Sequence, residues 1–151
     1  MRLQIASRIA IVALLDLAGQ PERQLSVAEL GKKYRLSSHH LAKVMNRLGR
    51  AGMVSAGRGV GGGYQFIGNP RRITLLDVIE LFEDLGSKED ERGGPSGTTA
   101  EGALLRQVLA EIDAFARSTF GSITIATMLK MRALRKDARS SRKRPAASRL
   151  T

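Results

Sequence analysis

The residues that decide the fold run from Ser26 to Ile67 and read SVAELGKKYRLSSHHLAKVMNRLGRAGMVSAGRGVGGGYQFI. Ser26 and Glu29 have the spacing of a capping box, in which a hydroxyl and a carboxylate each bind a backbone N–H at the start of a helix. Ser37 repeats the N-cap signal after a short break. The stretch therefore predicts two helices joined by a turn of a few residues, which is a helix-turn-helix.

The second helix of this pair has two chemically different sides. Apolar residues recur at helical spacing and predict a side facing a core: Leu41, Val44, Met45 and Leu48. The other side combines short hydrogen-bonding groups with cations: Ser38, His39, Ala42, Lys43, Asn46, Arg47 and Arg50. Such groups can bind base edges and phosphates. A solvated amphipathic helix is the simpler alternative, because charged outer faces are common.

A β-hairpin is predicted directly after this helix. Gly52 ends the helix, and the strand-like segments Met53–Ala56 and Tyr64–Ile67 flank a glycine-rich turn at 57–63. A hairpin in this place is the wing of a winged helix. Arg58, between glycines that permit close backbone approach, suits a narrow and strongly negative minor groove.

The sequence resembles the Rrf2 family of bacterial transcription regulators. The resemblance is most specific in the wing motif and weaker near Ala103–Met131. The segments that carry it are Met1–Leu3, Val27–Leu30, Leu41–Gly52, Arg58–Tyr64 and Ile73–Ile79. It implies a mainly α fold with a small β-hairpin wing, made of a winged helix-turn-helix domain plus a long C-terminal dimerisation helix.

The same resemblance implies a sequence-specific regulator, most simply a repressor, that binds a palindromic operator in double-stranded DNA as a homodimer. We expect the major groove and nearby phosphates to be contacted by Ser38, His39, Lys43, Asn46 and Arg47. Arg58 and Gly59 are expected in the minor groove, and Arg2 at a backbone phosphate. A basic winged-helix module that binds RNA or a protein partner is the alternative function.

Cysteine usage separates this chain from the best-known family members, in which three cysteines hold an iron–sulfur cluster. The chain has no cysteine, and cluster irons are held chiefly by thiolates. Its two histidines, His39 and His40, are adjacent and point about 100° apart on a helix, so they form no chelating pair. We therefore expect no cofactor and no metal. The effector, if one exists, is not evident from the sequence.

Charge is unevenly distributed along the chain, whose formal net charge is +11. Residues 1–72 hold 12 Lys/Arg against 3 Asp/Glu, giving +9, whereas residues 73–102 hold 2 against 8, giving −6. A basic N-terminal domain is typical of nucleic-acid binding proteins. Binding to a membrane surface is less compatible, because no broad Trp/Phe stripe opposes the cations. No segment has membrane-spanning length and none resembles a signal peptide, so a cytoplasmic protein is expected.

Four regions are predicted from these patterns. Residues 1–85 form the winged helix-turn-helix domain, 86–102 a mobile loop, 103–131 the dimerisation helices and 132–151 a basic disordered tail that could add non-specific DNA affinity. The first helix, from about Leu3 to Ala18, is apolar on nearly all sides, so a second subunit is expected to cover it.

Two other functions are disfavoured by the sequence. Gly57, Gly59 and Gly62 satisfy the G-x-G-x-x-G pattern, but a dinucleotide-binding turn must open a helix, and this turn enters a strand-like segment. No nucleophile lies beside a base and no carboxylates gather in a recognisable catalytic pattern, so an enzyme is not expected.

Overall fold

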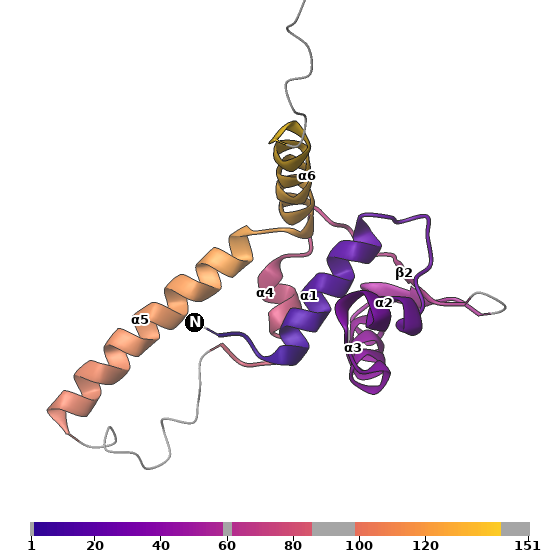
Figure 1. Ribbon diagram of the computed structural model, residues 1–151. Coiled ribbons are helices and arrows are strands. Elements are labelled where there is room, and N and C mark those ends of the chain that lie inside the picture. Colours follow the sequence, from indigo (N-terminus) through magenta and orange to yellow (C-terminus); the bar gives the residue numbers. More distant parts are fainter. Residues whose placement is uncertain (1, 59–61, 86–98, 143–151) are drawn as a thin grey trace, which may run out of the picture.

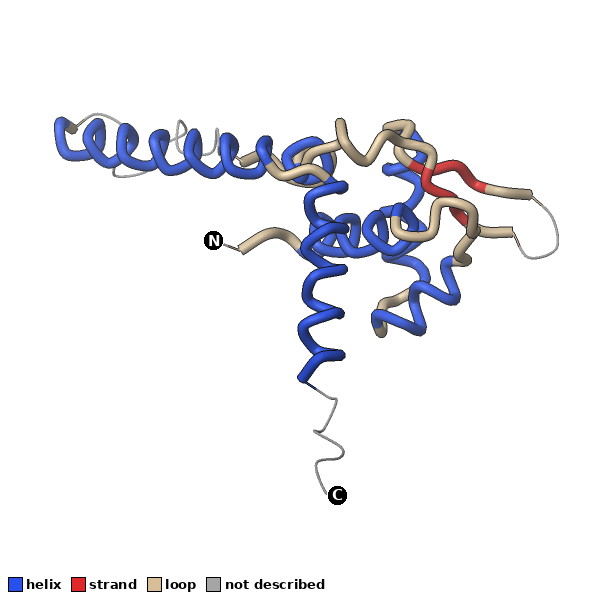
Figure 2. Tube along the Cα trace, turned by 90° about the horizontal axis from the view of Figure 1, so that it is seen from above, coloured by secondary structure: helices blue, strands red, loops and turns tan. Residues whose placement is uncertain are grey.

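The computed structural model describes residues 2–58, 62–85 and 99–142 (Figure 1). Within these ranges the chain is mainly helical, and a two-stranded hairpin lies at one edge of the body (Figure 2). The elements are α1 (Ile5–Ala18), α2 (Val27–Tyr34), α3 (Ser38–Arg50), β1 (Val54–Ala56), β2 (Tyr64–Phe66), α4 (Leu75–Ile79), α5 (Ala100–Ser122) and α6 (Ile125–Arg142). The expected mainly α fold with a small β-hairpin is confirmed.

Helix α1 is the centre of the hydrophobic core and lies between α4 and the α2–α3 pair (Figure 1). Its apolar residues face more than one neighbour, and Leu14 and Leu17 are fully buried. Ile5 is 59% exposed at the start of the helix. The other core side chains are Ile9, Ala10, Ala13, Ala18, Leu25, Leu30, Leu41, Val44, Met45, Leu48, Met53, Val54, Phe66, Leu75, Val78, Ile79, Leu85 and Ile125. Burial of this apolar surface is the main favourable term in folding.

The helix-turn-helix forms as its capping signals predict, with one exception. The Ser26 hydroxyl accepts from the Glu29 N–H at 3.0 Å, and the Glu29 carboxylate accepts from the Ser26 N–H at 2.8 Å. Arg35 ends α2 in the left-handed conformation, with φ of 54°, and so redirects the chain into α3. Ser37 is the N-cap residue of α3, but its hydroxyl makes no capping hydrogen bond, so that part of the prediction is wrong.

The wing is an antiparallel hairpin, as the sequence predicts, and Ala56 lies opposite Tyr64. Tyr64 also exchanges two backbone hydrogen bonds with Leu25, of 2.8 and 2.9 Å. The hairpin is thereby attached to the residue that precedes the α2 cap. Gly63 is required at this contact, because a Cβ atom there would lie 2.6 Å from the Leu25 carbonyl.

Helix α4 starts at a second capping box, in which Thr74 and Asp77 bind each other's backbone N–H groups. Helix α5 then extends away from the body in both views (Figures 1 and 2). The first turn of α5 is capped by Thr99, so residues 100–102 are helical. The predicted mobile loop, 86–102, therefore extends three residues too far. The rest of that loop, residues 86–98, lies outside the described residues.

The prediction of a disordered tail from Arg132 is wrong for residues 132–142, which continue α6. Part of the reason is a tertiary contact that local composition does not reveal. The Arg132 guanidinium donates to the Leu15 carbonyl at 3.1 Å, at the C-terminal end of α1. A Cβ atom on Gly19 would lie 2.0 Å from this guanidinium, so the glycine leaves room for it.

A buried carboxylate joins three helices next to that contact. The Asp16 side chain of α1 is 4% exposed and accepts hydrogen bonds from Lys33 Nζ at 2.6 and 2.7 Å and from the Tyr34 hydroxyl at 2.9 Å. Arg132 of α6 lies 3.9 Å from the same carboxylate. Because a buried charge is costly unless it is paired, this network fixes α2 and α6 against α1.

We expect the free energy of unfolding to fall as the pH rises above about 10. The hydrogen bond that Lys33 donates to Asp16 holds the pKa of Lys33 above its ordinary 10.5. Burial, and then the hydrogen bond that the hydroxyl donates to Asp16, raise the pKa of Tyr34 above 10.0. Both groups therefore keep their protons to higher pH in the folded chain than in the unfolded chain. Their contribution to the free energy of unfolding is complete below pH 10 and is lost above it. Thermal unfolding across pH 7–11 measures this, and Asp16→Asn should flatten the alkaline decline. An equally steep decline in that variant would contradict the assignment.

Candidate nucleic-acid interface

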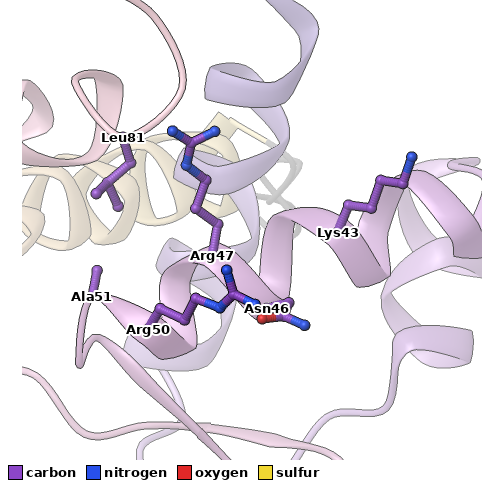
Figure 3. A pocket seen from close by; sticks show the side chains of 6 residues that line it. All are labelled: Lys43, Asn46, Arg47, Arg50, Ala51 and Leu81. Atoms are coloured by element: carbon purple, nitrogen blue, oxygen red, sulfur yellow. The ribbon is translucent and has the colours of Figure 1, made fainter.

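The exposed side of α3 forms one wall of an open cleft of about 530 Å³. Four of its polar side chains project along that wall, as Figure 3 shows: Lys43, Asn46, Arg47 and Arg50. Ala51 and Leu81 complete the lining. The opposite side of α3 is the buried apolar stripe, so helix packing aims these polar groups outward. Three of the residues expected from sequence to contact DNA are thus brought together.

Ser38 and His39 occupy the first turn of α3 and are exposed. They do not line the cleft, but they lie on the same helix, at its N-terminal end. In helix-turn-helix proteins the N-terminal residues of the second helix contact base edges. Their position is therefore compatible with the expected contact, and the backbone N–H groups of the first helical turn favour a nearby phosphate.

Arg47 is held in a more particular way than the sequence suggested. Its guanidinium carbon lies 5.5 Å from the centroid of the Phe82 ring, in the segment that follows α4. A cation over an aromatic face is attracted by the ring quadrupole, and the interaction strengthens when it is shielded from water. Arg47 therefore contacts a neighbouring element as well as lining the cleft.

The wing carries Arg58 as an exposed side chain beyond the end of β1. The base of the wing turn is closed by a 2.7 Å hydrogen bond from Gly57 N–H to the Gly63 carbonyl. Gln65 on β2 donates to the Pro21 carbonyl at 2.8 Å and further fixes the hairpin. Gly59, expected beside Arg58 at the DNA, lies outside the described residues.

Arg2 is exposed in the N-terminal segment that precedes α1. The N-terminal segment and the wing lie at opposite sides of the body in both views (Figures 1 and 2). The N-terminal segment and the wing of one protomer therefore do not form a single compact surface. A DNA contact from the N-terminal segment would therefore lie at a different part of the duplex from a contact made by the wing.

Arg50 lies on the polar side of α3 but is not among the residues predicted from the sequence to contact DNA. It lies one helical turn beyond Asn46 and Arg47, and it lines the same cleft. Its spacing of i+3 from Arg47 and i+7 from Lys43 was the available signal, because residues at those spacings share one helix face.

The donor set for a thiolate-bound iron–sulfur cluster is missing, because the full sequence contains no cysteine. Across residues 2–58, 62–85 and 99–142, no group of three or more His, Asp or Glu side chains is placed to hold a metal ion. The residues present therefore do not fit such a cluster.

A cationic helix packed behind a capped first helix and followed by a hairpin defines the class of winged helix-turn-helix proteins. Within this class, the family model Rrf2, described as iron-dependent transcriptional regulator, matches residues 3–131. The chain belongs to the Rrf2 family. It is a DNA-binding transcription regulator, since the family and the chain's relatives are transcription regulators and not enzymes.

The relatives support this at the level of sequence. BadM of Rhodopseudomonas palustris, named as a candidate HTH-type transcriptional regulator, is 44% identical over 131 residues, which cover 87% of this chain and 83% of BadM. IscR of Cereibacter sphaeroides, an HTH-type transcriptional regulator, is 33% identical over 108 residues, covering 67% of this chain and 70% of IscR.

Solved structures show the same fold. The oxidised form of Staphylococcus aureus CymR superposes with a TM-score of 0.70 at 21% identity, covering 85% of this chain and 96% of CymR. IscR of T. potens gives a TM-score of 0.65 at 24% identity over 97% of this chain and 94% of IscR. Among the helices described here, none is both long and apolar enough to cross a membrane.

Proposed function

We propose that this protein binds a palindromic operator in double-stranded DNA as a homodimer and represses transcription from it. The single observation that carries the proposal is the outward polar side of α3, on which Lys43, Asn46 and Arg47 line one cleft. Residues 1–85 act as the DNA-binding domain. In the bacterial relatives the genome lies in the cytoplasm, and the protein is proposed to act there.

The contacts divide by chemistry. Ser38, His39 and Asn46 carry short polar groups that discriminate bases in the major groove, and Lys43 and Arg47 bind phosphates beside it. Arg58, with the neighbouring Gly59, enters the minor groove, and Arg2 binds a phosphate. The +9 charge of residues 1–72 supplies the sequence-independent attraction to DNA.

Dimerisation is proposed through α5, whose apolar side chains are uncovered in the single chain. Ile112 is 57% exposed and Phe115 is 75% exposed, although both recur at helical spacing with other apolar residues. The exposed apolar stripe consists of Leu104, Leu105, Val108, Leu109, Ile112 and Phe115. A contiguous exposed patch of this kind marks an interaction site. A second copy related by a two-fold axis would cover it and would present two α3 helices to half-sites one or two helical turns of about 34 Å apart.

Two variants of α3 test whether this face recognises sequence. Asn46→Ala should lower the preference for the operator over a random duplex, because a bidentate base contact is lost. The difference between the two binding free energies should shrink by roughly 1–3 kcal/mol. Lys43→Ala should weaken both affinities similarly and reduce the salt dependence of binding by about one ion. Fluorescence anisotropy over a series of salt concentrations, on an operator selected from a random duplex library, gives both quantities. Equal ratios in wild type and Asn46→Ala, or tighter binding to single-stranded RNA, would refute the proposal.

The wing gives an independent prediction. Arg58→Ala should weaken operator binding by roughly 1–3 kcal/mol and leave the unfolding midpoint unchanged, because Arg58 is exposed. Electrophoretic mobility shift and thermal unfolding of the same preparation measure the two effects. Arg106 of α5 offers a matched control, since Arg106→Ala removes the same charge from a different part of the molecule. An equal loss in the control would show that only overall charge matters.

A further inference from the structure

We infer that residues 80–85, here called the connector, set the position of α3 relative to α5, with Phe82 and Arg117 as positioning residues. The inference rests on the proposed function, because it concerns how a dimer held by α5 orients a DNA-reading α3. The connector follows α4 and ends at the last residue described before the gap at 86–98. It contacts three helices that are far apart in the sequence.

The first contact is to α5. Arg117 donates to the Leu85 carbonyl at 3.3 Å and also forms an ion pair with the Glu80 carboxylate. One guanidinium thus binds both ends of the connector. Paired hydrogen bonds from the rigid guanidinium fork restrict orientation as well as distance. A shift of α5 in this region would therefore move the connector with it.

The second contact is to α3. The Phe82 ring faces the Arg47 guanidinium at 5.5 Å, and Arg47 lines a cleft of about 390 Å³ together with residues 80–84. Leu81 also lines the larger cleft of about 530 Å³, together with Lys43 and Asn46 of α3 (Figure 3). The connector is consequently one wall of the surface that is proposed to receive DNA. Its position determines where the Arg47 side chain can lie.

The third contact fixes the connector to the start of α1. Glu83 accepts from the Gln4 backbone N–H at 3.0 Å and from the hydroxyl of Ser7, which is fully buried. The connector therefore has an attachment on the central helix as well as one on each functional helix. Discrete packed contacts of this kind can carry energetic coupling between sites, and a double-mutant cycle is the direct test of it.

The consequence is that operator affinity depends on side chains that do not touch DNA. Phe82→Leu removes the aromatic face but keeps an apolar side chain, and Arg117→Met removes the hydrogen bonds to Glu80 and Leu85. Each should weaken operator binding by roughly two- to thirtyfold, the range found for residues that modulate coupling. Both substitutions break the same chain of contacts. The double variant should therefore bind the operator only slightly less tightly than the single variant with the larger loss of affinity.

The experiment measures operator affinity by anisotropy, dimerisation by sedimentation and stability by thermal unfolding, all on full-length protein. Phe82→Tyr keeps the ring and should restore affinity to within about twofold of wild type. Arg106→Met removes the same charge from α5 outside the connector's contacts and should bind like wild type. The positioning role requires the affinity losses to occur with the dimer and the unfolding midpoint retained.

Wild-type affinity in Phe82→Leu or Arg117→Met would overturn the inference, as would fully additive losses in the double variant or an equal loss in Arg106→Met. The proposed function is judged separately. If Asn46→Ala lowers sequence discrimination while Phe82→Leu has no effect, the DNA-reading role of α3 stands and only the connector fails. If Asn46→Ala is also silent, the function itself is wrong.

Discussion

Replacing Ile112 with glutamate is expected to make the protein monomeric and to weaken operator binding by about two orders of magnitude or more. Ile112 lies in the middle of the exposed apolar stripe of α5, so a carboxylate there would be buried without a partner in the proposed dimer. A monomer binds each half-site separately and loses the affinity that is gained when two DNA-binding units are linked. Sedimentation equilibrium measures the mass, and anisotropy on the palindromic operator measures the affinity.

Ala110→Glu is the matched control for this variant. Ala110 is exposed on the side of α5 opposite the stripe, and the substitution adds the same charge to the same helix. We expect it to remain dimeric and to bind the operator as wild type does. A dimeric Ile112→Glu protein, or equal losses in the two variants, would contradict the assignment of the stripe as the subunit interface.

Leu48→Ala is expected to lower the free energy of unfolding by about 2–5 kcal/mol. Leu48 is fully buried on the core-facing side of α3. Removing its side chain loses apolar burial and leaves a cavity. Urea denaturation at one fixed protein concentration measures the change, since the stability of an oligomer depends on concentration. Arg50→Ala, on the exposed side of the same helix, should change the free energy by no more than about 0.5 kcal/mol. A cost below about 1 kcal/mol for Leu48→Ala would place that residue outside the core.

The elements that sequence reasoning predicted well are those whose signals are local. The capping box at Ser26/Glu29 requires only residues three positions apart, and it forms as predicted. The hairpin follows from two strand-like segments around a glycine-rich turn, and its strands pair as expected. The apolar stripe of α3 likewise follows from its period, which also assigns the polar side to solvent.

The features that sequence reasoning missed depend on contacts between distant segments. The chain from Arg132 to Arg142 looks like a solvated basic tail by composition, yet it continues a helix that Arg132 attaches to α1. Phe82 fits the apolar period that follows Thr74, but its ring faces Arg47 of α3. No spacing within the sequence identifies either partner, because each pair is joined only by the tertiary fold.

The buried Asp16 is the same kind of feature. A lone aspartate in an apolar helix gives no indication of its partners, whereas in the fold it accepts from Lys33 and Tyr34 of α2. The Lys-Lys-Tyr run at the end of α2 is therefore partly structural. Such polar networks are specified by the geometry of several elements together.

The central claim is that two copies of the α3 and wing unit occupy one palindromic duplex at once. The most direct measurement is a hydroxyl-radical footprint on the selected operator, combined with the sedimentation mass of the complex. The account predicts two protein chains per duplex and a footprint with two-fold symmetry, its halves separated by one or two helical turns of about 34 Å. One chain per duplex, or a footprint confined to a single half-site, would contradict it.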